Sequence, residues 1–166
     1  AVAAWDIRPE RLLKAAEDGV RPARSGADAM CGAAVVISAV TADAAEAVAA
    51  QAAASLAPGQ IYLDVNSASP ATKTRAARVV EASGAHYVEG AVMAPVAAPR
   101  LRVPILGGGP GADMAARLLN PLGMNIRPVS TETGRASAMK LCRSIMIKGL
   151  EALIIDCAAA SKAWNV

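Results

Sequence analysis

The sequence predicts an α/β protein in which a doubly wound, mostly parallel sheet is followed by one long helix. Short apolar runs alternate with amphipathic segments of roughly 10–15 residues, which is the pattern of βαβ units. Pro and Gly residues separate these segments, as at 58–59 and 84. Beyond residue 131 the alternation stops and an alanine-rich apolar stretch begins. We therefore predict a sheet domain over residues 1–131 and a long helix within residues 132–166.

The first elements follow from local signals. Residues 1–5 (AVAAW) predict a short buried strand, and the helix after it stops at Gly19. Residues 33–40 (AAVVISAV) form a continuous apolar run, typical of a strand covered on both faces. Thr41 is placed to cap the next helix, which we expect to end at Pro58.

The later elements continue the alternation. Residues 60–65 (QIYLDV) predict a strand, and the helix after it has Ser69 as its cap and Pro70 in its first turn. Further strands are expected at 85–93, 102–109 and 125–130, with a helix closed by Gly123 before the last of them. The glycines at 107–109 favour a turn into that helix over a phosphate-binding loop. From Arg135 to about Ala163 the chain is apolar on almost every side, so we expect this helix to be buried.

Composition and charge exclude several classes of function. The net charge of +3 is spread over scattered Lys and Arg residues, without the basic clusters and interleaved aromatic residues that bind nucleic acids. No apolar run reaches the roughly 20 residues that span a bilayer. We therefore expect neither a nucleic-acid partner nor a membrane. The chain has no Phe, so we expect a core of Val, Leu, Ile, Met and Ala.

Cysteine and histidine usage argues against disulfide and metal chemistry. Cys31, Cys142 and Cys157 are odd in number and far apart, and His86 is the only histidine. A disulfide framework needs paired cysteines, and a zinc site needs clustered Cys or His residues. We therefore expect no metal site and a reducing, cytoplasmic location.

Asp6 lies directly after the first predicted strand. In a dinucleotide-binding fold, an acidic residue after the second strand binds the adenosine ribose, and a glycine-rich phosphate loop lies about 20 residues before it. On that interpretation the chain begins after the first βα unit of a Rossmann-like fold. A carboxylate here favours NAD, whereas the nearby Arg8 is the type of residue that accommodates NADP. Asp6 alone is equally well explained as a cap of the following helix.

Small polar residues follow the strand at 60–65. The carboxyl ends of parallel strands form the ligand-binding crevice of such folds, so Asn66 and Ser67 are expected to face a cofactor or substrate. We place Val40, which ends the preceding strand, with them. Spacing alone favours a local role instead, because Asn and Ser are common turn residues.

Ser137, Lys140, Ser144 and Lys148 recur at spacings of three and four residues, so they share one face of the long helix. A lysine kept from water has a lowered pKa, which suits proton transfer near neutral pH. Extension into solvent is the commoner outcome for a lysine. Arg143, beside Ser144, carries the forked guanidinium that binds carboxylates.

These segments, in this order, resemble the β-hydroxyacid dehydrogenase family, which includes 3-hydroxyisobutyrate and 6-phosphogluconate dehydrogenases. The family motif D-x-S-T-x-x-P is similar to residues 64–70 (DVNSASP). The motif G-x-G-x-x-x-K-x-x-x-N is similar to residues 134–144, with Lys140 at the lysine position. The resemblance implies NAD or NADP as cofactor and a long helix that leads to an all-helical domain absent from this chain. Exposed apolar faces of that helix favour a homodimer.

The resemblance also implies a role for each candidate residue. Lys140 is the expected general acid and base in hydride transfer between nicotinamide and a β-hydroxy acid or related alcohol. The expected cofactor-binding residues are Asp6, Arg8, Val40, Asn66 and Ser67. The expected substrate-binding residues are Ser67, Met93, Ala94, Arg143 and Ser144.

Two segments depart from the family pattern. Residues 89–95 (EGAVMAP) stand where the family has D-A-P-V-S-G-G, so the Ser-Gly-Gly clamp for a substrate carboxylate is missing. Ser144 stands where Asn is usual. These departures imply a substrate different from the familiar ones and a branch described as 6-phosphogluconate-dehydrogenase-like.

Two other classes of function remain open at this point. One is a nucleotide-binding regulatory or assembly module without catalysis, and the other is a different Rossmann enzyme, such as a methyltransferase or epimerase. A G-x-G-x-x-G loop within about 30 residues before Asp6 would favour the dehydrogenase, and its absence would favour the binding module.

Overall fold

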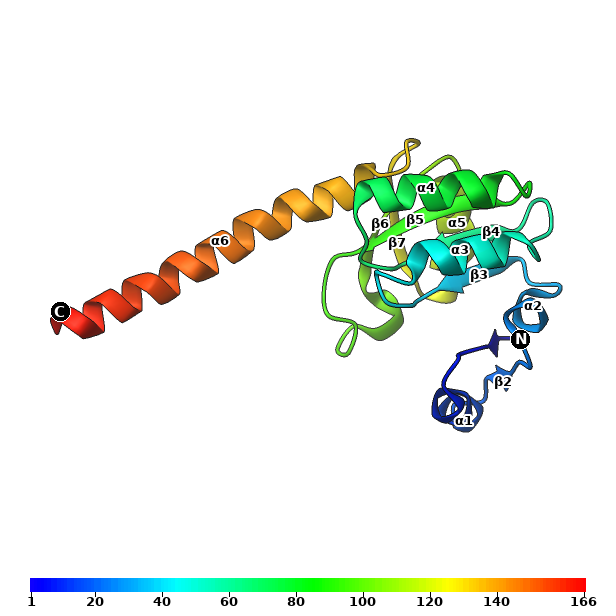
Figure 1. The fold of residues 1–166 in the computed structure, drawn as a ribbon, viewed down its shortest axis with the longest axis horizontal. Coiled ribbons are helices and arrows are strands. Elements are labelled where there is room, and N and C mark those ends of the chain that lie inside the picture. The colour runs from blue at the N-terminus through cyan, green and yellow to red at the C-terminus, as the bar shows by residue number, and fades with distance from the viewer.

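The computed structural model describes residues 1–166, in which strands and helices alternate as far as one long final helix (Figure 1). The strands are β1 (Ala3–Ala4), β2 (Arg21–Pro22), β3 (Val35–Ser38), β4 (Ile61–Asp64), β5 (His86–Val92), β6 (Pro104–Gly108) and β7 (Asn125–Ser130). The helices are α1 (Pro9–Glu17), α2 (Gly26–Met30), α3 (Ala45–Ala53), α4 (Pro70–Glu81), α5 (Ala112–Leu119) and α6 (Arg135–Trp164). The order confirms the predicted α/β class.

Strands β3 to β7 form a five-stranded sheet in sequential order, and only the β5–β6 pair is antiparallel. Strands β1 and β2 form a separate two-stranded parallel sheet. No ladder joins β3 to β1 or β2, so the strands of the predicted fold are divided between two sheets. As an edge strand, β3 is also less covered than its apolar sequence predicts, and Ile37 is 49% exposed.

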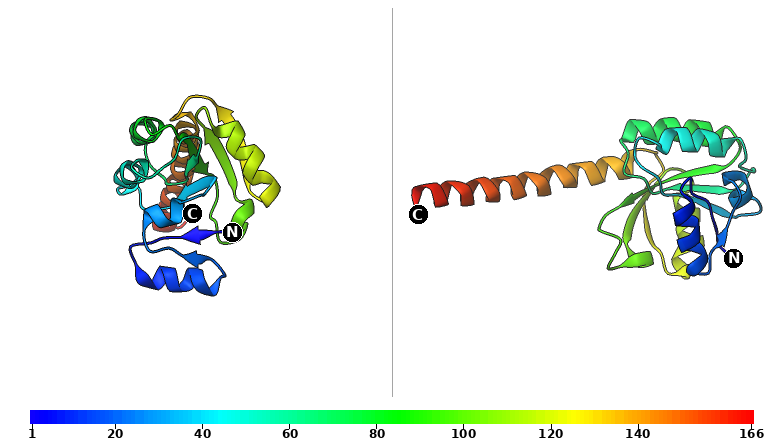
Figure 2. Two further views of the ribbon diagram at one scale, coloured as in Figure 1. Left: turned by 90° about the vertical axis from the view of Figure 1, so that its right-hand side faces the viewer. Right: turned by 60° about the horizontal axis from the view of Figure 1, so that its bottom comes forward.

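The sheet is the middle of three layers, with α3 and α4 on one face and α5 on the other (Figure 2). The alternation of β4 divides the core between these faces. Tyr62 packs with Ala49 and Val80 in one buried cluster, while Leu63 packs with Ala115 in the other. Small alanine side chains let the helices lie close to the sheet.

Two local predictions are wrong. Thr41 does not cap α3, which begins at Ala45 without a side-chain cap and ends at Ala53. A hydrogen bond from the Thr41 side chain to the Asp43 carboxylate instead lowers the pKa of Asp43. The core also contains both tyrosines, Tyr62 and Tyr87, whose stacked rings have centroids 6.0 Å apart. Tyr87 is tolerated there because its hydroxyl has a carboxylate partner, described below.

Helix α6 begins beside α4 and then projects away from the sheet domain (Figures 1 and 2). Only Ala136 and Ser137 are buried in it, so the prediction of a buried helix is wrong for most of its length. Beyond Ser144 its large apolar side chains are exposed because no other element of the chain packs on them. Despite its length, neither α6 nor any other helix is apolar enough over a sufficient span to cross a membrane.

Candidate active site

The side chains of Lys140 and Ser67 meet where α6 passes the carboxyl end of β4. Lys140 Nζ donates a hydrogen bond of 2.8 Å to Ser67 Oγ, although 73 residues separate them in the chain. Ser67 is exposed in the loop after β4, and Lys140 is half-buried in the second turn of α6. Burial lowers the pKa of the Lys140 amine from its ordinary value of 10.5. Two segments singled out by sequence therefore come together at the edge expected for ligand binding.

A buried polar network lies beneath the Ser67 loop, with Asp64 at its centre. Lys73 Nζ lies 2.8 Å from Asp64 Oδ1 and also donates to the Asp64 carbonyl at 2.9 Å. The Tyr87 hydroxyl donates to Asp64 Oδ2 at 2.7 Å, and the Asn66 backbone N–H donates to Oδ1 at 2.9 Å. Desolvation lowers the pKa of Lys73, and the charge of Asp64 opposes that effect. Because every partner is buried, this network fixes the start of the loop that carries Ser67.

The side chain of Asn66 joins the ends of β3 and β4. Its Oδ1 accepts from the Val40 backbone N–H, and its Nδ2 donates to Ser38 Oγ at 3.1 Å. The structure thus places Asn66 and Val40 in contact with each other. These two hydrogen bonds of the Asn66 side chain link the end of β3 to the end of β4, next to the loop that carries Ser67.

Glu89 fixes the start of α6 from the middle of β5. Its side chain is completely buried, and Oε1 accepts from the backbone N–H groups of Gly134 and Ala136, each at 2.8 Å. Oε2 accepts from the Ser137 hydroxyl at 2.7 Å. These bonds satisfy donors that a helix N-terminus otherwise leaves without partners. Gly134 has φ of +98°, a conformation that favours glycine.

The expected substrate residues lie around the next turn of α6. Arg143 Nη1 donates to the Met93 carbonyl at 2.6 Å, which ties α6 to the segment after β5. Ala94 is half-buried and packs against the core cluster that contains Leu63. Ser144 lies four residues beyond Lys140 and is also half-buried. Ser137 shares their helical spacing, but its hydroxyl is engaged by Glu89 instead.

Asp6 lies two residues after β1, whose two-stranded sheet is separate from the five-stranded sheet that carries the Ser67 loop. Its Oδ1 accepts from the Arg8 backbone N–H at 2.9 Å, and Arg8 Nε lies 3.5 Å from the same oxygen. Asp6 therefore contacts Arg8, the residue that precedes α1, but it does not cap the helix, whose N-cap Arg8 has no side-chain cap bond. Its side chain stays 36% exposed, and no hydrogen bond engages Oδ2, so this oxygen can accept a further hydrogen bond.

Sequence reasoning missed the importance of Lys73 and Glu89. Glu89 lies inside the otherwise apolar run at 85–93, and a carboxylate in a strand buried on both faces needs internal partners. That misfit is the signal that identifies it. Lys73 gives no such signal, because a lysine in an amphipathic helix normally faces solvent. Neither they nor their neighbours form a cluster of metal-binding side chains.

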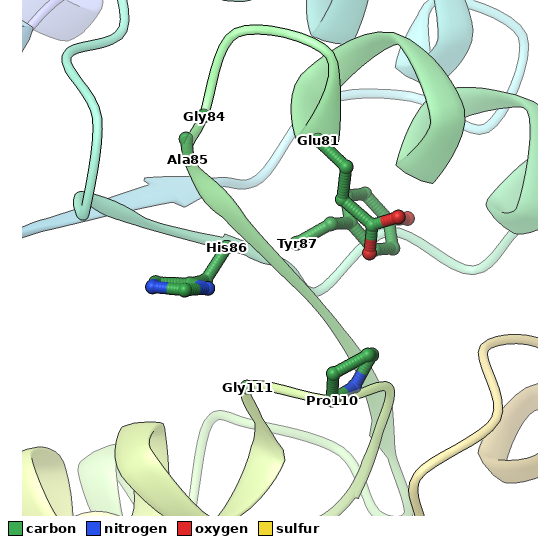
Figure 3. A pocket seen from close by; sticks show the side chains of 7 residues that line it. All are labelled: Glu81, Gly84, Ala85, His86, Tyr87, Pro110 and Gly111. Atoms are coloured by element: carbon green, nitrogen blue, oxygen red, sulfur yellow. The ribbon is translucent and has the colours of Figure 1, made fainter.

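A shallow cavity of about 260 Å³ lies at the amino-terminal end of β5 (Figure 3). It is lined by His86 at the first residue of the strand, with Glu81 and Pro110 beside it. None of the candidate residues contributes to this cavity. The candidate site is instead the open surface around Ser67 and Lys140, which extends beside the projecting α6.

The fold and these contacts define a nucleotide-binding α/β domain with a lysine-bearing helix at its ligand edge. Residues 1–117 match the NAD binding domain of 6-phosphogluconate dehydrogenase, and the chain belongs to that family. The match spans the separate β1–β2 sheet and the strands up to β6. It confirms the family resemblance noted in the sequence.

Solved structures agree on the fold over nearly the whole chain. A conserved hypothetical protein from Sinorhizobium meliloti 1021 is 40% identical with a TM-score of 0.88, and the match covers 99% of this chain and 57% of that protein. A conserved protein described as structurally similar to 3-hydroxyacid dehydrogenases is 31% identical with a TM-score of 0.84, covering 96% and 59%. The 3-hydroxyisobutyrate dehydrogenase of Mycobacterium tuberculosis, solved with L-serine, is 20% identical with a TM-score of 0.88, covering 99% and 58%. The chain thus spans less than two thirds of each of these proteins.

Proposed function

We propose that the protein is an NAD(P)-dependent oxidoreductase that transfers a hydride between nicotinamide and a β-hydroxy acid or related alcohol, with Lys140 as general acid and base. The observation that carries this proposal is the 2.8 Å hydrogen bond between Lys140 Nζ and Ser67 Oγ. It joins a half-buried amine to the loop at the carboxyl end of β4, where ligands of this fold class bind. The NAD binding family of residues 1–117 supports the cofactor class.

Lys140 has the chemistry that the proton step needs. Its lowered pKa increases the fraction of neutral amine near physiological pH. In oxidation the neutral amine accepts the proton of the substrate hydroxyl, and in reduction the ammonium group returns it to the carbonyl oxygen. A bound nicotinamide supplies the hydride acceptor or donor. Ser67 holds the amine in position before substrate enters.

The substrate is expected to lie between the Ser67 loop and the second and third turns of α6. Ser67 and Ser144 offer hydroxyls to the substrate, and Met93 and Ala94 line the segment opposite them. Arg143 uses Nη1 for the Met93 carbonyl, which leaves its other guanidinium donors to bind a carboxylate. This arrangement is the basis for proposing an acidic substrate.

The cofactor preference rests on Asp6 and Arg8. The free oxygen of Asp6 fits the two ribose hydroxyls of NAD, and its charge repels a 2′-phosphate. Arg8 forms an ion pair with that carboxylate, which keeps its guanidinium from binding the 2′-phosphate of NADP. NAD is therefore the proposed cofactor. Val40 and Asn66, which follow β3 and β4, are the proposed cofactor contacts on the five-stranded sheet.

The experiment is a titration of the full-length protein with NAD and NADP, followed by turnover with a panel of hydroxy acids. We expect tighter binding of NAD and turnover of at least one acid. The Lys140→Ala variant should bind NAD as the wild type does, while kcat falls by about 10²–10⁴-fold. Full turnover in that variant would overturn the catalytic role of Lys140. Cofactor binding without turnover of any acid would favour a regulatory nucleotide-binding module instead.

A further inference from the structure

Strand β5 and the residue that follows it bind α6 through hydrogen bonds at two points, on either side of Lys140. The first is Glu89, which accepts from the start of the helix at Gly134, Ala136 and Ser137. The second is the Met93 carbonyl, which accepts from Arg143. Lys140 lies between these contacts along the helix, three residues beyond Ser137 and three before Arg143.

We infer that Glu89 is a positioning residue for Lys140, and that β5 sets the approach of the lysine to Ser67 through this carboxylate. The inference deepens the proposed function and rests on it only for the consequence in catalysis. Glu89 touches neither Lys140 nor Ser67, so it acts through the helix. The bond to Ser137 lies within one helical turn of the lysine and all three lie within two turns, so a tilt of the helix axis there is transmitted to its side chain.

The rigidity of Glu89 supports this role. Glu89 is 0% exposed, and in the strand register it lies opposite Asp64 on β4 and Gly108 on β6. A Cβ at position 108 would overlap the Glu89 carboxylate, so the glycine leaves the space that this side chain fills. The same strand ladder therefore fixes the Glu89 carboxylate and the Asp64 end of the Ser67 loop.

The rest of α6 gives Lys140 no other support from its own chain. The helix is exposed beyond Ser144 apart from a half-buried Ser161, and only Ala136 and Ser137 are buried. The exposed Arg143 contact is a single hydrogen bond and competes with water. Glu89 supplies the buried hydrogen bonds between β5 and the start of α6, and it determines whether Lys140 stays beside Ser67.

The test compares Glu89→Ala, Glu89→Gln and Ser137→Ala in the full-length protein. Glutamine can still accept from both backbone N–H groups and can donate to the Ser137 hydroxyl, so it preserves the geometry without the charge. Glu132→Gln is the matched control, because Glu132 is an exposed carboxylate near the same helix start that binds only Arg135.

The primary measurement is the pKa of Lys140, from NMR titration of its labelled ε-carbon without cofactor or substrate. We expect Glu89→Ala to move this pKa toward 10.5, and Glu89→Gln and Glu132→Gln to leave it unchanged. If Glu89→Ala does not fold, Ser137→Ala should move the pKa in the same direction by a smaller amount. An unchanged pKa in the folded Glu89→Ala variant, or in Ser137→Ala when it must serve alone, would overturn the inference.

Turnover gives the second measurement. Glu89→Ala should lower kcat by about 10²-fold, the loss expected from an error of roughly 1 Å in position, while the Kd of NAD stays within threefold. Glu89→Gln should restore most of kcat. Equal loss in the Ala and Gln variants would contradict positioning through hydrogen bonds. A shifted Lys140 pKa in a protein that turns over no hydroxy acid would support the inference and reject the proposed function.

Discussion

The two parts of α6 have opposite structural fates, and the more apolar part is the exposed one. Its first turns, from Arg135 to Ser144, are joined to the sheet domain through Glu89, Ser67 and Met93. The remainder, to Trp164, is exposed and has no side-chain hydrogen bond to the domain. Apolarity alone therefore does not decide which part of a helix is fixed. The fixed part is the one whose polar residues find partners on neighbouring strands.

The largest effect on stability is expected in the buried network around Asp64, beneath the first turns of α6. Asp64→Ala leaves Lys73 buried without its ionic partner, and such a loss costs about 3–5 kcal/mol of unfolding free energy. The control is Glu46→Ala, which breaks the pair between Glu46 and Arg75 whose side chains are 43% and 52% exposed. That exposed pair should contribute little to stability, because solvent screens its charges. Urea denaturation of residues 1–166 measures both, and equal losses would contradict the account.

A smaller effect separates the two parts of α6 directly. Ala136 is fully buried, so Ala136→Leu should overpack the contact between the start of α6 and the sheet domain. This should cost about 1–3 kcal/mol of unfolding free energy. The same substitution at the exposed Ala158 should change stability by less than about 0.5 kcal/mol. Thermal unfolding of the two variants provides the comparison. A loss at Ala158 as large as that at Ala136 would show that the outer part of the helix is also packed.

The smallest effect on stability is expected at the exposed end, where association is the informative measurement. Leu153, Ile154 and Ile155 are each about two thirds exposed, and an apolar surface of this kind favours self-association. We expect sedimentation velocity to show association of residues 1–166 and to show less of it for Ile154→Glu. Lys162→Glu is the control for added negative charge. A wild-type chain that stays monomeric at tens of micromolar would reject the expected homodimer.

Sequence patterns predicted the sheet domain because strand and helix periodicities are local properties. The strand predicted at 60–65, the Ser69 cap of α4 and the length of α6 all follow from neighbouring residues. The split between the two sheets could not be predicted in this way, because strand pairing depends on contacts between distant segments.

The candidate site shows the same division. The residue type and helical spacing of Lys140 singled it out, together with the family motif, and its contact with Ser67 joins two segments that were identified separately. The role of Glu89 depends on partners 45 to 48 residues away, and that of Lys73 on Asp64. Such partners become visible only when the chain is folded.

The most direct test of the central claim is the pH dependence of kcat in both reaction directions. Because oxidation needs neutral Lys140, its kcat should rise about tenfold per pH unit and level off at a pKa below 10.5. Because reduction needs the ammonium form, its kcat should fall through the same pKa. Both limbs should be absent from the residual activity of Lys140→Ala. Profiles that keep these limbs without Lys140 would show that another group transfers the proton.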